Sequence, residues 1–139
     1  MAERVKLNTG DLQIIALIET STGAHVKDCI LTEQSITIIT ETGEAGKAIG
    51  PGGRNAKMLE QRLKRRVRIV EYHPELITFV TGLVAPARLR DAREADGVVT
   101  LYAADSQTRG ILIGRGGSNL RAYEAIVQRY FPIKEIKVE

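Results

Sequence analysis

The sequence contains the stretch Ile49-Gly50-Pro51-Gly52-Gly53-Arg54-Asn55, and a second copy stands at Ile113-Gly114-Arg115-Gly116-Gly117-Ser118-Asn119. Five of the seven positions are identical, namely the isoleucine, three glycines and the asparagine. The copies lie close to half a chain length apart, and similar patterns of apolar residues surround both. An internal repeat at this distance indicates two copies of one small fold.

The residues around the first copy predict a helix, two strands, the glycine cluster, a second helix and a closing strand. Thr9 or Asp11 is expected to cap the first helix, which should end near Gly23. The expected ranges after it are strands over 26–31 and 35–40, a helix over 54–65 and a strand over 67–72. The apolar faces of the two helices are expected to be Leu12, Ile15, Ala16 and Ile18, and Ala56, Leu59 and Leu63.

The second copy has the same order of predicted elements. Pro74 suits the first turn of a helix that runs through Phe79 to about Val84, and Pro86 should stop it. The later expected ranges are strands over 88–94 and 98–103 joined around Asp96-Gly97, a helix after the glycines, and a strand over 133–138. The inner face of that helix is expected to be Leu120, Tyr123, Val127 and Tyr130.

The repeat therefore predicts an α+β fold of two domains, residues 1–73 and residues 74–139, each with the order α-β-β-α-α-β. Almost no linker separates them, so we expect the two domains to be rigidly docked. The longest apolar runs are far too short to cross a bilayer, and no signal peptide is evident at the N-terminus. We expect a cytoplasmic protein with no membrane segment.

Positive charge is concentrated around each glycine cluster, although the net charge is only +3. Residues 46–70 hold one acid, Glu60, and the basic residues Lys47, Arg54, Lys57, Arg62, Lys64, Arg65, Arg66 and Arg68. Residues 106–130 hold one acid, Glu124, and the basic residues Arg109, Arg115, Arg121 and Arg129. Two local positive patches are typical of a protein that binds a polyanion with one face, although two solvated helix surfaces would look the same.

The glycine clusters are suited to phosphate binding. Glycine adopts left-handed backbone angles and leaves room for a close approach, and a helix that starts beside it offers free N–H groups and a positive dipole end. Ile49 and Ile113 are expected to face inward and anchor the loops. The candidate binding residues are Lys47, Ile49, Gly50, Pro51, Gly52, Gly53, Arg54 and Lys57 in the first copy, and Ile113, Gly114, Arg115, Gly116, Gly117, Ser118 and Asn119 in the second.

Other glycine motifs do not fit these letters. A P-loop needs serine or threonine after Gly46-Lys47, where Ala48 stands, and an earlier glycine where Glu41 stands. The dinucleotide fingerprint needs glycine at Asn55 and Asn119. The residues Ser106, Asp105, His25, His73 and Cys29 form no recognisable catalytic set. We expect no enzyme activity, no cofactor and no metal site.

The motif Ile-Gly-X-X-Gly at 49–53 and 113–117 resembles the signature of the KH family, whose glycine loop clamps a short run of nucleotides. Only one helix and one strand fit after Gly117, so both copies resemble type II KH domains, in which a helix and two strands precede the loop. The tandem arrangement further resembles the RNA-binding core of the NusA family in its short archaeal form. The resemblance implies single-stranded RNA as ligand, held at about four nucleotides per loop, and a role in transcription termination or antitermination.

Two other interpretations stay open at this point. The pair could be a protein-interaction module that docks on RNA polymerase, another transcription factor or a ribosome-associated partner. It could also bind ribosomal RNA. If the loops clamp a backbone, the bases are expected to turn towards an apolar groove between the loop helix and the sheet edge, with Val67 and Ile69 as groove or core residues. Aromatic residues make up only 4% of the chain, which argues against base-stacking platforms, so Tyr123 and Tyr130 are interpreted as packing residues.

Overall fold

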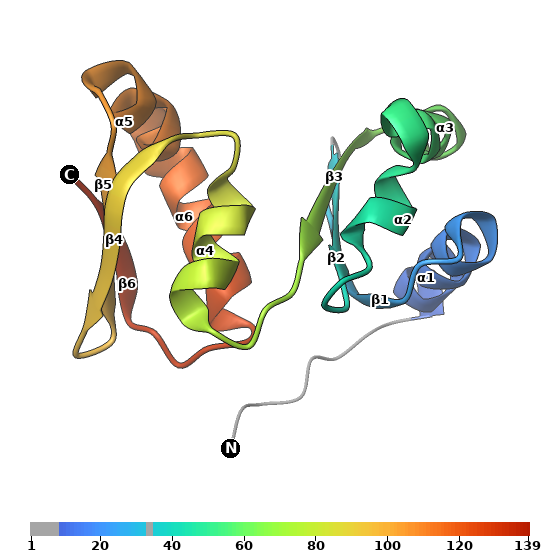
Figure 1. The fold of residues 1–139 in the computed structure, drawn as a ribbon, viewed down its shortest axis with the longest axis horizontal. Coiled ribbons are helices and arrows are strands. Elements are labelled where there is room, and N and C mark those ends of the chain that lie inside the picture. Colours follow the sequence, from blue (N-terminus) through green and yellow to red (C-terminus); the bar gives the residue numbers. More distant parts are fainter. Residues whose placement is uncertain (1–8, 33–34) are drawn as a thin grey trace. The chain divides into compact units, whose positions relative to one another are not determined.

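A computed structural model describes residues 9–32 and 35–139. These residues form two compact units, and the boundary along the chain falls between His73 and Pro74 (Figure 1). Both units have the order helix, two strands, two helices and strand, with a short 3-10 turn between the paired helices. The α+β class predicted from the sequence is confirmed. The order of elements is the same before and after His73.

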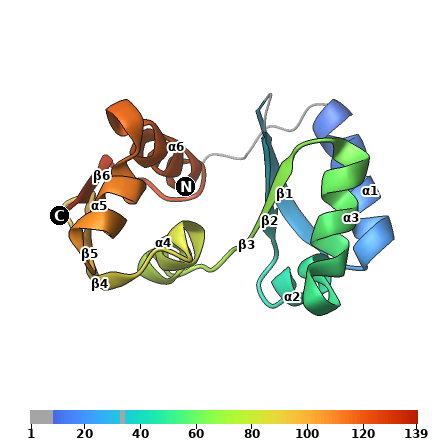
Figure 2. The ribbon, with the colours of Figure 1, turned by 90° about the horizontal axis from the view of Figure 1, so that it is seen from above.

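The N-terminal unit consists of α1 (Thr9–Thr22), β1 (Val26–Leu31), β2 (Ser35–Thr40), α2 (Ala45–Ile49), η1 (Pro51–Gly53), α3 (Arg54–Leu63) and β3 (Arg66–Glu71). Strand β2 is central in the sheet, antiparallel to β1 and parallel to β3. Helices α1 and α3 cover one face of this sheet (Figure 2). Helix α3 ends two residues before its expected end, because Lys64 takes a left-handed conformation with φ 54° and ψ 40°.

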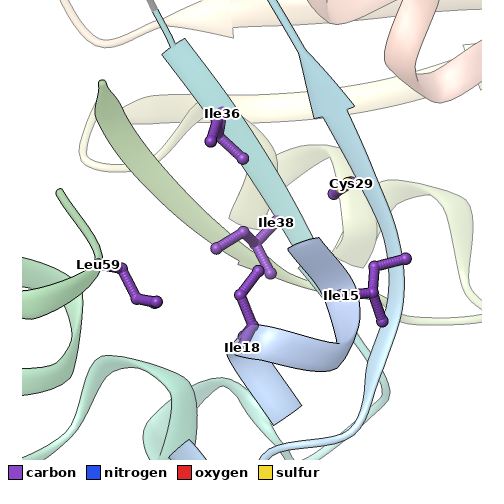
Figure 3. Packing of buried hydrophobic residues seen from close by; sticks show 6 residues of the cluster. All are labelled: Ile15, Ile18, Cys29, Ile36, Ile38 and Leu59. Atoms are coloured by element: carbon purple, nitrogen blue, oxygen red, sulfur yellow. The ribbon is translucent and has the colours of Figure 1, made fainter. Parts of the chain in front are cut away.

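The core of the N-terminal unit joins its helices to its sheet. The buried side chains are Ile15 and Ile18 of α1, Cys29 of β1, Ile36 and Ile38 of β2, and Leu59 of α3 (Figure 3). The alternation of Ile36 and Ile38 places both on the same face of the central strand. Full burial of one such side chain stabilises the fold by about 1.5–3 kcal/mol. This core holds α3, and with it the end of the glycine loop, on the sheet.

The expected apolar face of α1 is wrong at two positions. Leu12 is 52% exposed and Ala16 is exposed, whereas Ile14 packs against the core. At about 100° per residue, Ile14 lies on the same side of the helix as Ile15 and Ile18, and Leu12 and Ala16 lie outside it. The predicted cap by Thr9 or Asp11 falls on side chains outside the described part of the chain.

The C-terminal unit consists of α4 (Leu76–Val84), β4 (Leu89–Ala95), β5 (Val98–Ala103), α5 (Ser106–Ile113), η2 (Arg115–Gly117), α6 (Ser118–Gln128) and β6 (Glu135–Val138). Its sheet has β5 at the centre, antiparallel to β4 and parallel to β6. The prediction that Pro74 lies in the first turn of α4 is wrong. Glu75 caps this helix instead, since its carboxylate accepts hydrogen bonds from the N–H groups of Ile77 at 2.9 Å and Thr78 at 3.0 Å.

The hairpin of the C-terminal unit follows its turn residues. Asp96 and Gly97 both have positive φ, 53° and 82°, as a two-residue turn between antiparallel strands requires. Strand β6 starts two residues later than expected, and Ile133 is buried before the strand begins. The predicted hairpin is confirmed, while the strand ends shift by one or two residues.

Helix α4 supplies much of the core of the C-terminal unit. Its buried residues are Phe79, Val80, Leu83 and Val84, and the helix packs against β4 and α6. The same unit also buries Val99 and Leu101 of β5 and Val127 of α6. The rings of Phe79 and Tyr130 pack edge to face with centroids 5.6 Å apart. Tyr130 is only 9% exposed, so this ring serves packing, as the sequence predicted.

Candidate nucleic-acid interface

The two glycine loops have nearly the same backbone conformation. In the first, the φ/ψ angles are 76°/168° at Gly50, 61°/20° at Gly52 and 78°/16° at Gly53. In the second, they are 73°/176°, 62°/20° and 79°/13° at Gly114, Gly116 and Gly117. All six φ angles lie in the region that side chains with a Cβ rarely adopt. Two segments with different neighbours therefore build one loop geometry.

An asparagine side chain braces each loop from within the following helix. The Nδ2 of Asn55 donates a hydrogen bond to the carbonyl of Lys47 at 2.9 Å, and the Nδ2 of Asn119 donates to the carbonyl of Ile111 at 2.7 Å. Each bond ties the first turn of the helix after the loop to the last turn of the helix before it. Asn119, a candidate binding residue, therefore has a structural contact as well, and Asn55 was missed as a site residue.

The hydrogen-bonded asparagine also explains why the first loop residue, Gly50 or Gly114, is a glycine. A Cβ on Gly50 would lie 2.7 Å from the Cγ of Asn55, and a Cβ on Gly114 would lie 2.8 Å from the Cγ of Asn119. Gly52 and Gly116, in contrast, have open space where a Cβ would point. The first glycine of each loop makes room for the asparagine, whereas the middle glycine faces outward where a ligand can come close.

The helices after the loops start without a side-chain cap. Gly53 and Gly117 occupy the cap positions of α3 and α6, and neither helix has an acid in its first turn. Helices α4 and α5 of the same chain are capped by the carboxylates of Glu75 and Asp105. The starts of α3 and α6 therefore present the positive end of the helix dipole with no carboxylate beside it, which favours an anion.

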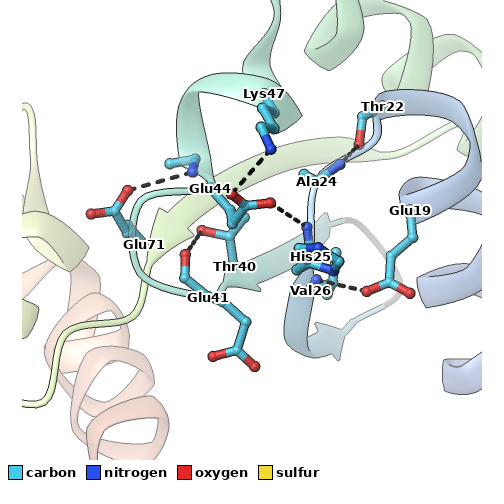
Figure 4. A network of polar contacts seen from close by, with 11 residues as sticks. Glu19, Thr22, Ala24, His25, Val26, Thr40, Glu41, Glu44, Lys47 and Glu71 are labelled. Carbon is cyan, nitrogen blue, oxygen red and sulfur yellow. Dashed lines mark hydrogen bonds and ion pairs between the residues drawn. The ribbon is translucent and has the colours of Figure 1, made fainter.

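Lysine and arginine side chains lie around the first loop, and they differ in whether a carboxylate pairs with their positive charge. The Nζ of Lys47 lies 3.4 Å from the Oε2 of Glu44 (Figure 4), while Arg54 and Lys57 are exposed and make no ion pair within the described residues. Arg54 opens α3, where the helix dipole disfavours a positive charge. The fold alone gives no reason for a cation at this position, and a bound anion would supply one.

A polar network holds α2 next to the start of β1 (Figure 4). The Oε1 of Glu44 accepts from the N–H of His25 at 2.9 Å, and the Oε1 of Glu71 accepts from the N–H of Ala45 at 3.4 Å. The hydrogen bond from His25 lowers the pKa of Glu44, and Lys47 lowers it further. The helix that leads into the first loop is thus fixed at its own start.

Of the isoleucines before the loops, Ile49 does not face inward as expected, and Ile113 does so only in part. Ile49 is 38% exposed and Ile113 is half-buried, while the residues just before them, Ala48 and Leu112, are buried. A helix of five residues such as α2 has too few turns for its apolar spacing to show which side is buried. Ile49 thus places apolar surface beside the first loop.

The single acid of each basic segment has a structural contact. The Oε2 of Glu60 accepts from the N–H of Val67 at 3.0 Å, and the Oε2 of Glu124 accepts from the N–H of Ile136 at 2.9 Å. Each bond joins a loop helix to the edge strand of its sheet. Sequence reasoning missed this role, although the acids repeat at matching distances from the two loops.

In the C-terminal unit, a hollow of about 530 Å³ lies between the loop helices and the sheet edge, lined by Arg109 of α5, Leu120 of α6 and residues 135–139. It stands where the sequence places the groove for bases. In the N-terminal unit, Val67 and Ile69 are half-buried and pack against the core.

Within residues 9–32 and 35–139, no three His, Cys, Asp or Glu side chains gather closely enough to hold a metal ion. Among the helices of these residues, none has the length and apolar character needed to cross a membrane.

The chain is similar to a known family, to named relatives and to a solved structure. The KH domain family matches residues 14–102. The chain is 33% identical over 137 residues to "Probable transcription termination protein NusA" of Halococcus morrhuae, which covers 97% of this chain and 99% of that protein. A protein of the same name from Methanocaldococcus jannaschii is 30% identical over 138 residues, covering 97% of this chain and 75% of that one. The crystal structure of APE1850 matches with a TM-score of 0.76 at 27% identity, covering 96% of this chain and all of that one.

The fold, the glycine loop and the family match define the class of protein, and this chain belongs to the KH domain family. Within that family it is one of the archaeal NusA-like proteins, with which it shares about a third of its residues over nearly its whole length. The resemblance stated from the sequence is confirmed.

Proposed function

We propose that the chain is a single-stranded RNA-binding protein built from two type II KH domains, residues 1–73 and 74–139, each of which clamps the RNA backbone with its glycine loop. The proposal includes rigid docking of the two domains, since no linker separates them, and a cytoplasmic location. The names of the relatives support participation in transcription termination or antitermination, with RNA polymerase or other transcription factors as partners. No catalytic step is part of this function.

The observation that carries the proposal is the pair of matching loops, each open where a phosphate would sit. The family match ends at residue 102, so for the second loop the support is its own geometry. Its φ/ψ angles repeat those of the first loop, its following helix is uncapped, and Arg115 is exposed within it. Asn119 repeats the brace of Asn55.

In the proposed mechanism, RNA phosphates lie against the loop and the start of the following helix. The helix dipole contributes about 0.3–1 kcal/mol for each anion near the surface. Arg54 and Lys57 at the first loop, and Arg115 and Arg121 at the second, add full positive charges. The bases turn towards the groove between loop helix and edge strand, which in the C-terminal unit is the hollow beside Leu120.

The test is a fluorescence-anisotropy titration with a mixed panel of single-stranded RNA oligomers. The loop variants are Gly52→Asp with Arg54→Asp, and Arg115→Asp with Gly116→Asp. Gly52 and Gly116 have space for a side chain, and aspartate tolerates positive φ better than most residues, so both variants should fold. The matched control is Gly23→Asp with Arg88→Asp, since Gly23 also has a positive φ of 76° and open space.

Loss of affinity in both loop variants, with the control unchanged, is the expected result, and the relative losses rank the two loops. If the wild type binds no RNA at low salt, the clamp is refuted. A KH-fold module that docks on RNA polymerase or a ribosome-associated partner then becomes the leading account.

A further inference from the structure

The N-terminal unit carries more positive charge than its glycine loop accounts for. Beyond Arg54 and Lys57, four more cations stand near the end of α3 and the start of β3, namely Arg62, Lys64, Arg65 and Arg66. Arg62, Lys64 and Arg66 are exposed and Arg65 is half-buried. Within the described part of the chain, none of the four side chains makes an ion pair or a side-chain hydrogen bond.

The cations run from the glycine loop along α3 and gather around the end of this helix and the start of β3. Arg54, Lys57 and Gln61 lie on the side of α3 opposite the buried Leu59, as their spacing at about 100° per residue requires. The face then reaches Lys64, whose left-handed conformation ends the helix. Arg62 is exposed on a neighbouring side of α3, and Arg66 is exposed as the first residue of β3. At about 1.5 Å per residue, the cations extend about 15 Å from the loop. We call Arg62, Lys64 and Arg66 the basic track.

The second unit supplies an internal comparison, because its loop and following helix have the same geometry. The residues matching Arg62 and Lys64 on the loop helix are Ile126 and Gln128, and the residue matching Arg66 at the start of the edge strand is Glu135. Lys57 and Arg65 have the matching cations Arg121 and Arg129. The shared fold and the shared loop therefore do not require the track.

A purely structural reason for the track is weak. Cations near a helix C-terminus complement its dipole, but α6 has no basic residue in its last turn. A solvated helix face usually mixes both signs of charge. Here the single acid is Glu60, and its carboxylate is held by the N–H of Val67. The track is left as uncompensated positive charge, which suits a polyanion.

We propose that the basic track binds the phosphates of the RNA segment that leaves the first glycine loop, so that the N-terminal unit holds a longer run of RNA than the C-terminal unit. This inference rests on the proposed RNA binding. It adds a second RNA-binding surface, and it makes the two units unequal in the length of RNA that they hold. The partner chemistry is a chain of phosphates, because the track has exposed cations and little apolar surface.

The experiment uses the full chain with the second loop disabled by Arg115→Asp and Gly116→Asp, so that only the N-terminal unit binds. The track variant adds Arg62→Gln, Lys64→Gln and Arg66→Gln. A control variant removes the same charge elsewhere through Arg88→Gln just before β4, Arg93→Gln on β4, and Lys134→Gln beside the hairpin turn. Binding to a short RNA that fills one loop and to an RNA about three times longer is measured by anisotropy over a salt series.

The track variant is expected to bind the longer RNA about tenfold more weakly than the control, with the short RNA unchanged. Its slope of log affinity against log salt should be shallower by about 2, because each phosphate contact to a single strand contributes about 0.7. Equal effects of track and control variants on the longer RNA would overturn the inference, as would equal losses on both RNAs. Failure of the proposed function is a different result, since the wild type would then bind neither RNA.

Discussion

Replacing Asn55 with alanine should loosen the first loop from inside. The change removes the 2.9 Å hydrogen bond to the carbonyl of Lys47 and the side chain that packs beneath Gly50. A hydrogen bond of this kind contributes about 0.5–1.5 kcal/mol, so the free energy of unfolding should fall by about 1 kcal/mol. RNA affinity should fall by about fivefold, since a loop held in several conformations binds less well.

The measurements are chemical denaturation of the variant and its RNA affinity by anisotropy, with Gln61→Ala as control on the same helix. Gln61 is exposed, so its removal should change stability by less than about 0.5 kcal/mol. Normal stability of Asn55→Ala combined with weaker RNA binding would refute the brace. Asn55 would then be a residue that contacts RNA directly.

A double-mutant cycle tests the same contact from the other side. Gly50→Ala forces a Cβ into a strained backbone position and to 2.7 Å from the Cγ of Asn55. Strain and overpacking each cost about 1–3 kcal/mol. In the Asn55→Ala background the clash with the Asn55 side chain is relieved, while the backbone nitrogen of residue 55 stays 3.0 Å from the Cβ. The two losses should therefore fall short of additive by about 1 kcal/mol. Strict additivity would contradict the packing described for this loop.

Three more predictions concern single contacts. Lys57→Ala should make the salt slope of RNA binding shallower by about 0.7, and an unchanged slope would remove Lys57 from the phosphate contacts. Glu60→Ala should lower the free energy of unfolding by about 0.5–1.5 kcal/mol in a denaturant titration, because the N–H of Val67 loses its acceptor. The N–H of Thr108 lowers the pKa of Asp105, so the cap of α5 is fully present above about pH 4 and is lost as the pH falls through the lowered pKa. Asp105→Ala should therefore flatten the acid limb of the stability profile, and an unaltered limb would assign it to other carboxyls.

The sequence was sufficient for the features that depend on local chemistry. The repeated glycines predicted both loops, the Ile- and Thr-rich run predicted β2, and Asp96-Gly97 predicted the hairpin of the C-terminal unit. The prediction failed where a short helix offered no periodicity, as at Ile49. It also failed at Pro74, because the carboxylate of Glu75 and not the proline fixes the start of α4.

The contacts across the chain could not be read from composition or spacing. The repeat does place an asparagine five residues after the first glycine of each loop, but only coordinates show that its amide reaches a carbonyl eight residues earlier. The same holds for Glu60 and Glu124, which counted as minor opposing charges and in fact hold the edge strands. The asparagines and the glutamates each recur at the same distance from the two glycine loops, and this repetition is the signal that could have identified their roles.

The measurement that tests the central claim most directly is the affinity of the unaltered chain for single-stranded RNA as a function of salt. If roughly four phosphates are held by the loops and their cations, log affinity should fall with log salt at a slope of about −3. A flat salt response, or no binding at low salt, would contradict a backbone clamp built from the two glycine loops.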